Sequence, residues 1–290
     1  MIAITGASGQ LGRLVIASLL RSGVAPSGIV ALVRNPAKVA DLAAQGIAVR
    51  QADYADAAGW GAALQGARRV LLISSSEVGQ RTAQHQTVID AARRVGVELL
   101  AYTSALHADT SALNLAQEHR ETEALLKASG VPHVLLRNGW YTENYLASVG
   151  AALQHGALLG SAGEGRIASA ARADYADAAA AVLTTSGQAG KVYELAGDSA
   201  YTLADLAAEI SRVSGKPVPY RDLPQPDYAQ ALQGAGLPPP VADLISQSDA
   251  AAARGALFDA SGQLGQLIGR PTTPWQAQVA EAVRAATAGA

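Results

Sequence analysis

The chain has 290 residues, of which 49% are hydrophobic and 16% charged, so it can form one large or two smaller folded domains. A formal net charge of −2 with no long basic run argues against nucleic acid or an anionic membrane as the partner. The absence of cysteine excludes disulfides, thiolate nucleophiles and cysteine-ligated zinc. No apolar run approaches the roughly 18 residues that cross a bilayer, so we expect no membrane insertion and a cytoplasmic location.

The beginning of the chain predicts a nucleotide-binding turn. Residues 2–5 are a short apolar run, which indicates a buried strand, and Gly6, Gly9 and Gly12 follow at three-residue spacing. Apolar side chains then recur at helical spacing. In dinucleotide-binding proteins this order lets the pyrophosphate approach the backbone and face the first N–H groups of the helix. The alternative is a tight strand-to-helix turn without a ligand.

Five more short apolar runs follow, and each indicates a strand. They cover residues 29–33, 47–50, 70–73, 99–103 and 134–137. Segments with helical patterns separate them, for example residues 115–129. Strands that alternate with helices in this way favour an α/β fold with a doubly wound parallel sheet.

The end of the second predicted strand indicates which nicotinamide cofactor is used. Sites for NADH place an acid about 20 residues past the glycine turn, where it accepts hydrogen bonds from the ribose 2′-hydroxyl. This chain has Arg34 at the strand end and Lys38 one helical turn later. Cations attract the 2′-phosphate of NADPH, so we expect NADPH to be preferred over NADH. The alternative is that both are ordinary solvated charges.

Polar residues also follow the third and fourth predicted strands. Asp53 either accepts a hydrogen bond from the adenine amino group or caps the helix expected to begin near Asp56. Ser74, Ser75 and Ser76 follow the fourth strand, at the edge where open α/β sheets bind ligands. The alternative for these serines is to cap the next helix.

The GxxGxxG spacing resembles the fingerprint of extended and atypical short-chain dehydrogenase/reductases, which implies a nicotinamide cofactor rather than a flavin. Most short-chain dehydrogenases combine a Ser or Thr after the fifth strand with a Tyr-x-x-x-Lys pair on the next helix. Ser104 fits the first position, but none of the nine tyrosines has a lysine four residues later. Alcohol or ketone chemistry of the usual kind is therefore disfavoured.

The helix after the fifth strand instead carries His119 and Glu123, four residues apart on one face. One interpretation is a proton shuttle in which the carboxylate raises the pKa of the imidazole. The other is a surface pair that contributes about 0.2–0.5 kcal/mol. Ser104 and His119 are therefore the candidate catalytic residues. No group of His, Asp or Glu residues has a convincing metal-site spacing, and we expect no metal.

Several longer segments resemble one family over nearly the full length of the chain. They are ITGASGQLG (residues 4–12), VRNPAK (33–38), RQADY (50–54), LLISSSEVGQR (71–81), AYTS (101–104), HADTS (107–111), LRNGWYTENY (136–145) and KVYELAGDS (191–199). The family is the bacterial type 2 NAD(P)H:quinone oxidoreductases, which are NmrA-like members of the atypical short-chain dehydrogenase/reductases. The resemblance weakens after about residue 221.

The resemblance implies hydride transfer from NADPH to a quinone without flavin or metal. It also implies a Rossmann-type doubly wound sheet with a smaller, mostly helical C-terminal domain, and a quinone bound in the cleft between the domains. The expected NADP-binding domain comprises residues 1–139 and about 172–197. The expected substrate domain comprises residues 140–171 and 198–290. The sequence does not predict the oligomeric state or the physiological quinone.

The resemblance also assigns residues to the cofactor. The glycine turn would hold the pyrophosphate, and this group consists of Gly6, Ala7, Ser8, Gly9, Gln10, Leu11 and Gly12. Ser8 stands where the family often has Thr, and we expect little effect. Arg34 would hold the 2′-phosphate, and the serines 74–76 would line the ribose and nicotinamide. The nicotinamide pocket would be walled by Asn138, Gly139, Trp140, Tyr141, Thr142, Glu143 and Asn144. Arg172 would reach the cofactor or the cleft, or simply pair with an acid.

Three aromatic residues within six positions, Trp140, Tyr141 and Tyr145, are candidate contacts for a planar quinone. The alternative is that they are core aromatics of the smaller domain. Residues 141–154 predict a helix, the glycine-rich residues 156–165 predict either a mobile lid or a plain loop, and Asp174 is a candidate helix cap. Residues 202–205 resemble a capping box, and residues 237–240 end one helix and begin another.

Two other functions remain open from the sequence. NmrA-like relatives include regulators that bind NADP(H) without turnover, and they also lack the Tyr/Lys pair. A sugar-nucleotide or isoflavonoid-type reductase would need a proton donor for an alkoxide, and only Ser104 or His119 has a suitable position.

Overall fold

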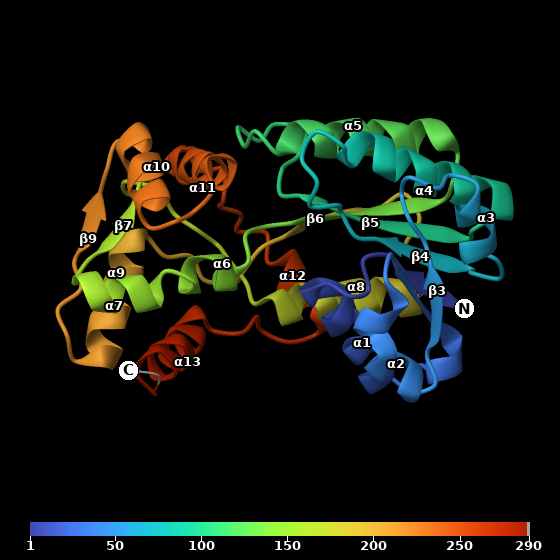
Figure 1. Cartoon of the computed structure of the whole chain (residues 1–290), viewed down its shortest axis with the longest axis horizontal. Helices are drawn as coiled ribbons and strands as arrows, with labels where there is room; N and C mark the ends of the chain where they lie inside the picture. The colour runs from blue at the N-terminus through green and yellow to red at the C-terminus, as the bar shows by residue number, and fades with distance from the viewer. Residues whose placement is uncertain (289–290) are drawn as a thin grey trace. The chain divides into compact units, whose positions relative to one another are not determined.

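The computed structural model describes residues 1–288, and the chain divides into two compact units. Unit 1 comprises Met1–Asp109, Leu115–Asn138 and Ala173–Glu194. Unit 2 comprises Thr110–Asn114, Gly139–Arg172 and Leu195–Ala290. The two units are described separately below, with the elements labelled as in Figure 1.

A seven-stranded sheet forms the centre of unit 1 (Figure 1). Its strands are β1 (Ile2–Ile4), β2 (Ile29–Val33), β3 (Ala48–Gln51), β4 (Arg69–Leu72), β5 (Leu99–Ala105), β6 (His133–Asn138) and β8 (Val192–Leu195). Their order across the sheet is β3-β2-β1-β4-β5-β6-β8. β1 pairs in parallel with both β2 and β4, so that Ile2 lies opposite Ile29 and Arg69. The order of strands reverses beside β1, which is the arrangement of the Rossmann fold.

Helices cover both faces of this sheet. They are α1 (Gln10–Arg21), α2 (Ala40–Ala44), α3 (Gly59–Ala63), α4 (Arg81–Val95), α5 (Ala116–Ser129) and α8 (Arg172–Thr184), with short 3-10 turns at Pro26–Gly28 and Pro36–Val39. α3, α4 and α5 lie on one face in Figure 1, and α1, α2 and α8 lie on the other. The predicted doubly wound parallel sheet is therefore confirmed.

The core under α3, α4 and α5 is built from alternate residues of the strands. Val70 and Leu72 of β4, together with Leu100 and Tyr102 of β5, point to this face and are fully buried. Successive side chains of a strand point to opposite faces, so this spacing directs one set of apolar residues against these helices. Trp60 of α3 closes the same core and stacks on Tyr54.

Unit 2 is mostly helical. Its elements are α6 (Thr142–Leu146), α7 (Val149–His155), β7 (Leu158–Gly160), α9 (Leu203–Ser214), β9 (Tyr220–Asp222), α10 (Gln225–Gly234), α11 (Pro239–Ala252), α12 (Gln263–Ile268) and α13 (Trp275–Ala288). β7 and β9 pair in parallel as a separate two-stranded sheet. The capping box at the start of α9 is present, with Thr202 and Asp205 bonding each other's backbone N–H groups.

Three local predictions are wrong. The single helix expected over residues 141–154 is two helices, α6 and α7, with the break after Leu146. The glycine-rich stretch at residues 156–165 is neither a lid nor a plain loop, because it contains β7. Asp174 lies inside the first turn of α8 and not at its cap. None of the helices in residues 1–288 is long and apolar enough to cross a membrane.

Candidate cofactor-binding site

The turn between β1 and α1 requires its glycines. Gly6 has a φ of +58°, a conformation that residues with a Cβ rarely adopt. A Cβ on Gly12 would lie 2.5 Å from the carbonyl oxygen of Gly6 and 2.8 Å from the Cα of Ala7. The turn and the helix therefore pack against each other more closely than any side chain would allow.

The start of α1 suits an anion. Gly9 is the N-cap, no side chain caps the helix, and the first turn contains no acidic residue. The first N–H groups of a helix have no partner inside the helix, and its dipole favours negative charge there. The predicted pyrophosphate-binding residues therefore fit a dinucleotide diphosphate by backbone chemistry.

The strand order brings further predicted residues to the same edge of unit 1. Arg34 follows β2 and Asp53 follows β3, while the serines 74–76 follow β4. Because the strands are parallel, these segments leave the sheet at the carboxyl edge, beside the glycine turn after β1. In open α/β sheets this edge holds the ligand, at the point where the strand order reverses.

The charged candidates at this edge have defined surroundings. Arg34 is exposed, and its Nη1 lies 2.9 Å from Oε1 of Glu77. Lys38 is exposed, and its backbone carbonyl accepts a hydrogen bond from Arg13. Asp53 accepts a bond from the N–H of residue 55, and Asp56 accepts one from Gly59 at the start of α3. Asp56 thus bonds the first residue of α3, and Asp53 stabilises a local turn.

Buried side chains fix the backbone of the serine loop. The N–H of Ser74 donates to Oγ1 of Thr103 (2.8 Å), and the N–H of Ser75 donates to Nε2 of His85 (3.0 Å). The carbonyl of Ser75 accepts a bond of 2.7 Å from Nε of Arg81. His85 and Arg81 could not be predicted from the sequence, because a polar helix such as α4 shows no pattern that marks which of its polar residues face inward.

The hydrogen bonds of His85 fix which of its ring nitrogens carries the proton. Its Nε2 accepts from Ser75, so Nδ1 carries the proton and donates to Oγ1 of Thr122, 2.9 Å away. Thr122 in turn donates to the carbonyl of Glu118. Burial, with a smaller effect of the positive charge of Arg81, lowers the pKa of His85 to about 3. The imidazole is therefore neutral at physiological pH.

Asn138, the last residue of β6, presents an unpaired acceptor. Its backbone carbonyl accepts a hydrogen bond from Leu106, but its side-chain Oδ1 is buried without a hydrogen-bond partner among residues 1–288. An unpaired buried acceptor is costly, and in a native protein it calls for an explanation. A ligand that offers an amide N–H, such as a nicotinamide carboxamide, would satisfy this oxygen.

The hydroxyl of Ser104 is engaged inside unit 1. Ser104 is 4% exposed, and its Oγ donates to Oε1 of Glu123 at 2.6 Å. Arg137 of β6 holds the same carboxylate with two bonds, 3.0 Å from Nε and 2.7 Å from Nη2. Arg137 also contacts Glu194 and Asp109. Ser104 therefore belongs to a buried ion-pair network that joins β5, α5 and β6.

The predicted pairing of His119 with Glu123 is wrong. His119 is buried, and its Nδ1 lies 2.7 Å from the hydroxyl of Tyr102, whereas Glu123 is bound by Ser104 and Arg137. Burial is the main cause that lowers the pKa of His119 to about 3. The expected increase in this pKa is therefore also wrong. The spacing rule compares positions on one helix and does not include partners on neighbouring strands.

The predicted site residues of unit 2 are closely packed among themselves. The backbone N–H of Arg172 donates to both carboxylate oxygens of Glu143 (3.0 and 3.2 Å), and its guanidinium lies 4.6 Å from the ring centre of Tyr141. Nη1 of Arg172 also lies 3.9 Å from Oε1 of Glu143, so the acid-pairing alternative for Arg172 is observed. Backbone bonds hold the rest of the segment, with Gly139 donating to Leu195 and Asn144 donating to Tyr141.

The remaining residues of this segment face other parts of unit 2. The carbonyl of Trp140 accepts from Ala170, and Oγ1 of Thr142 lies 2.8 Å from Oγ of Ser169. Tyr145 is buried, and its hydroxyl donates to Oδ1 of Asp249 at 3.0 Å. The core alternative therefore fits Tyr145.

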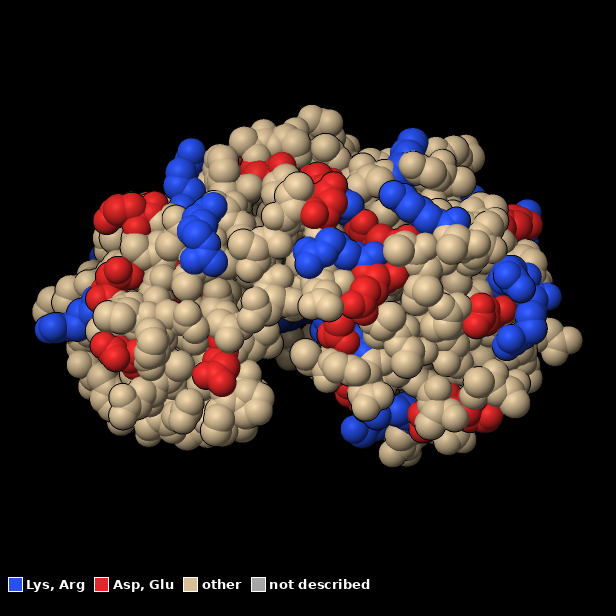
Figure 2. All heavy atoms as spheres, turned by 90° about the horizontal axis from the view of Figure 1, so that it is seen from above, with Lys and Arg blue, Asp and Glu red and all other residues tan. Residues whose placement is uncertain are grey.

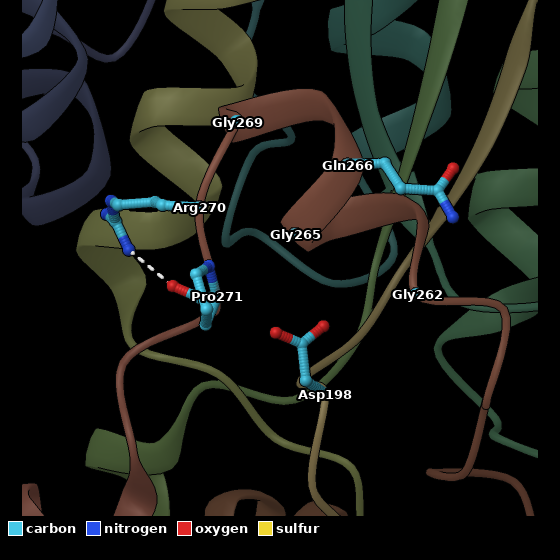
Figure 3. Close-up of a pocket in the computed structure, with 7 residues that line it drawn as sticks. All are labelled: Asp198, Gly262, Gly265, Gln266, Gly269, Arg270 and Pro271. Atoms are coloured by element: carbon cyan, nitrogen blue, oxygen red, sulfur yellow. Dashed lines mark hydrogen bonds between the residues drawn. The ribbon is translucent and has the colours of Figure 1, made fainter.

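Neither hollow described here includes a predicted site residue. One, of about 390 Å³ in unit 2, is lined by Asp198 and the glycines around α12 (Figure 3). Asp198 is held there by Thr272, whose N–H donates to its Oδ2. The other, of about 430 Å³ in unit 1, lies at the amino ends of β1 and β4, opposite the glycine turn.

Within residues 1–288, no three His, Asp or Glu side chains are grouped as metal ligands. Figure 2 shows acidic and basic side chains mixed over the visible face of each unit.

Comparisons with known proteins agree with this geometry. A family model described as NAD(P)H-binding matches residues 6–186. Quinone oxidoreductase 2 of Escherichia coli (strain K12) is 61% identical over 273 residues, which are 94% of this chain and 95% of that protein. The crystal structure of the NADPH-dependent quinone oxidoreductase from Escherichia coli in complex with NADPH matches with a TM-score of 0.95 at 60% identity, over 97% of this chain and 99% of that one.

A second solved structure extends the comparison to another substrate. The triphenylmethane reductase of Citrobacter sp., complexed with NADP(H), is 36% identical with a TM-score of 0.93, over 97% of this chain and 100% of that one. Fold, glycine turn and sequence identity over nearly the whole chain agree. The chain therefore belongs to the NAD(P)H-binding family that includes quinone oxidoreductase 2 of Escherichia coli.

Proposed function

We propose that this protein is an NADPH-dependent quinone oxidoreductase that transfers a hydride directly to the quinone, without flavin or metal. The observation that carries the proposal is the match to an NADPH-bound quinone oxidoreductase at 60% identity over 97% of this chain. The glycine turn of this chain retains the backbone geometry that a dinucleotide needs. A non-catalytic redox sensor is not favoured, because this relative, quinone oxidoreductase 2 of Escherichia coli, is an NADPH-dependent oxidoreductase.

The residues of unit 1 divide the work of binding NADPH. The backbone of residues 6–12 binds the pyrophosphate, and Arg34 with Lys38 attracts the 2′-phosphate. Asp53 lies on the adenine side, and the serines 74–76 line the ribose and nicotinamide. Asn138 accepts a hydrogen bond from the carboxamide, which is supported by its unpaired buried Oδ1.

The chemical step makes modest demands on side chains. Bound NADPH supplies a hydride, and with one proton the quinone becomes a hydroquinone. The protein must hold the quinone ring against the nicotinamide and exclude water, which are tasks of proximity and orientation. The hydroxyl of Ser104 is bonded to Glu123, and His119 is buried and neutral, so we assign the proton to solvent.

Several finer assignments stay predictions. Residues 139–144 and Arg172 are candidate cofactor residues within unit 2, and Trp140 and Tyr141 are candidate quinone contacts. Unit 1 is proposed as the NADP-binding domain, and unit 2 as the source of quinone selectivity. The cytoplasmic location is also a prediction.

Steady-state oxidation of NADPH tests the function. We expect the near-ultraviolet absorbance of reduced nicotinamide to fall steadily when the protein is mixed with NADPH and a small benzoquinone or naphthoquinone. A parallel assay with NADH and a blank without protein provide the controls. Saturable NADPH binding with no oxidation across several quinones would contradict the proposal and support the sensor.

A further inference from the structure

An exposed ion pair at the carboxyl edge of unit 1 joins the two strands that flank β1. Arg34 follows β2, and Glu77 lies in the loop after β4, yet Nη1 of Arg34 and Oε1 of Glu77 are 2.9 Å apart. β1 lies between β2 and β4 in the sheet. The pair therefore connects the segments on either side of the glycine turn that follows β1.

Glu77 is held in this position by more than the arginine. Its Oε2 accepts a bond of 2.7 Å from Nε2 of Gln84, and its N–H donates to Oγ of Ser75 at 3.2 Å. The side-chain oxygen of Gln84, Oε1, is buried without a hydrogen-bond partner in residues 1–288. The carboxylate thus orients the Gln84 amide even though this leaves an acceptor unsatisfied.

A carboxylate in this position opposes a phosphate. Arg34 is the cation assigned to the 2′-phosphate, and Glu77 neutralises part of its charge at hydrogen-bond distance. A phosphate that binds Arg34 must share the guanidinium with Glu77 or displace it, with the two anions close together. The ribose of NADH carries a hydroxyl in place of this phosphate, and a carboxylate accepts a hydrogen bond from such a hydroxyl.

We propose that Glu77 limits the preference for NADPH over NADH by competing with the 2′-phosphate for Arg34. This inference rests on the proposed function, in which Arg34 reads that phosphate. Glu77 is then a specificity-determining residue that acts on the cofactor through its charge. It has no part in the chemical step.

The test is the variant Glu77→Gln, which keeps the length of the side chain and one acceptor oxygen and removes its charge. We expect the Kd for NADPH, from fluorescence titration, to fall about two- to fivefold, while the Kd for NADH stays the same or rises. High salt should reduce the difference from the parent protein, because exposed charges are screened. A ratio of the two Kd values that is unchanged, or that shifts toward NADH, would overturn the proposal.

Two further variants make the result unambiguous. Glu98→Gln is the matched control, because Glu98 forms an exposed ion pair with Arg68 near the amino end of β5, away from the glycine turn. It should leave both Kd values unchanged. Arg34→Gln tests the underlying assignment, and equal losses for NADPH and NADH would show that the phosphate is read elsewhere. The thermal midpoint of each variant confirms that it is folded.

Discussion

Ser104 stands where many short-chain dehydrogenases carry a catalytic hydroxyl, but here its surroundings give it a structural role. Its hydroxyl donates to Glu123, which Arg137 also holds with two bonds. A buried carboxylate is stable only when paired, so these residues depend on one another. A quinone is already electrophilic and needs no strong acid, which is consistent with the use of this position for packing.

Gly12 allows a sharp test at the scale of one residue. Gly12→Ala adds a Cβ that meets the backbone of residues 6 and 7, which cannot move without displacing the turn. Overpacking of this kind typically costs about 1–3 kcal/mol. If this cost distorts the turn that binds the pyrophosphate, we expect NADPH affinity to fall roughly tenfold or more. Isothermal titration measures the Kd, and circular dichroism verifies folding.

The control for this variant is Gly61→Ala. Gly61 lies in α3 of the same unit, and a Cβ there meets nothing within 4 Å. This change should leave NADPH affinity unaltered. If Gly12→Ala binds NADPH as tightly as the control, the pyrophosphate does not lie against this turn.

At the scale of elements, periodicity and turn chemistry predicted what is local. The strand at residues 29–33, the helix at 115–129 to within a residue, and the capping box at Thr202 all follow from short-range rules. The burial of His85 and Arg81 in α4 does not follow from such rules. These side chains contact residues that are distant along the sequence or in the preceding loop. For the same reason the role of Glu77, a loop residue, could not be predicted.

The contact between α4 and the serine loop gives a prediction at this scale. His85→Leu removes the acceptor for the N–H of Ser75 and leaves a partly buried donor unpaired, which costs up to about 1–3 kcal/mol. We expect a higher KM for NADPH with a smaller change in kcat, since the loop lines the cofactor and performs no proton transfer. The effect should be constant between about pH 6 and 9, because the imidazole has a pKa of about 3 and stays neutral.

His85→Gln is the matching rescue. Its side-chain oxygen can accept from Ser75, so part of the lost NADPH affinity should return. Were His85→Leu to match the parent protein in both KM and thermal midpoint, the loop would not depend on this histidine.

At the scale of the whole molecule, neither unit is a continuous segment. Unit 1 includes Ala173–Glu194, which returns after a long excursion into unit 2, and Thr110–Asn114 belongs to unit 2 although both flanks belong to unit 1. The stability of the chain therefore combines contributions from two cores. A ligand of unit 1 and a titrating group of unit 2 should be visible as separate effects on unfolding.

Asp249 of α11 is that titrating group. It is 2% exposed, and burial is the main cause that raises its pKa to about 6, despite bonds from Tyr145 and Ser161. Its ordinary pKa is 3.8, so the folded protein favours the neutral acid and ionisation opposes folding. The resulting loss of stability is absent below about pH 4, grows as the pH rises from about 4 to 6, and is constant above pH 6.

Asp249→Asn removes this dependence, because the amide stays neutral at every pH. It also loses the acceptor for Ser161, which adds a loss of stability that does not vary with pH. We therefore expect the free energy of unfolding of the parent protein, relative to the variant, to fall by up to about 3 kcal/mol as pH rises from about 4 to 6. Asp243→Asn, which removes an exposed carboxylate of the same helix, is the control. Denaturant unfolding at several pH values measures the free energy of unfolding of each protein. If the difference between the parent protein and Asp249→Asn does not change with pH, as expected for the control, then Asp249 is charged at little cost inside unit 2.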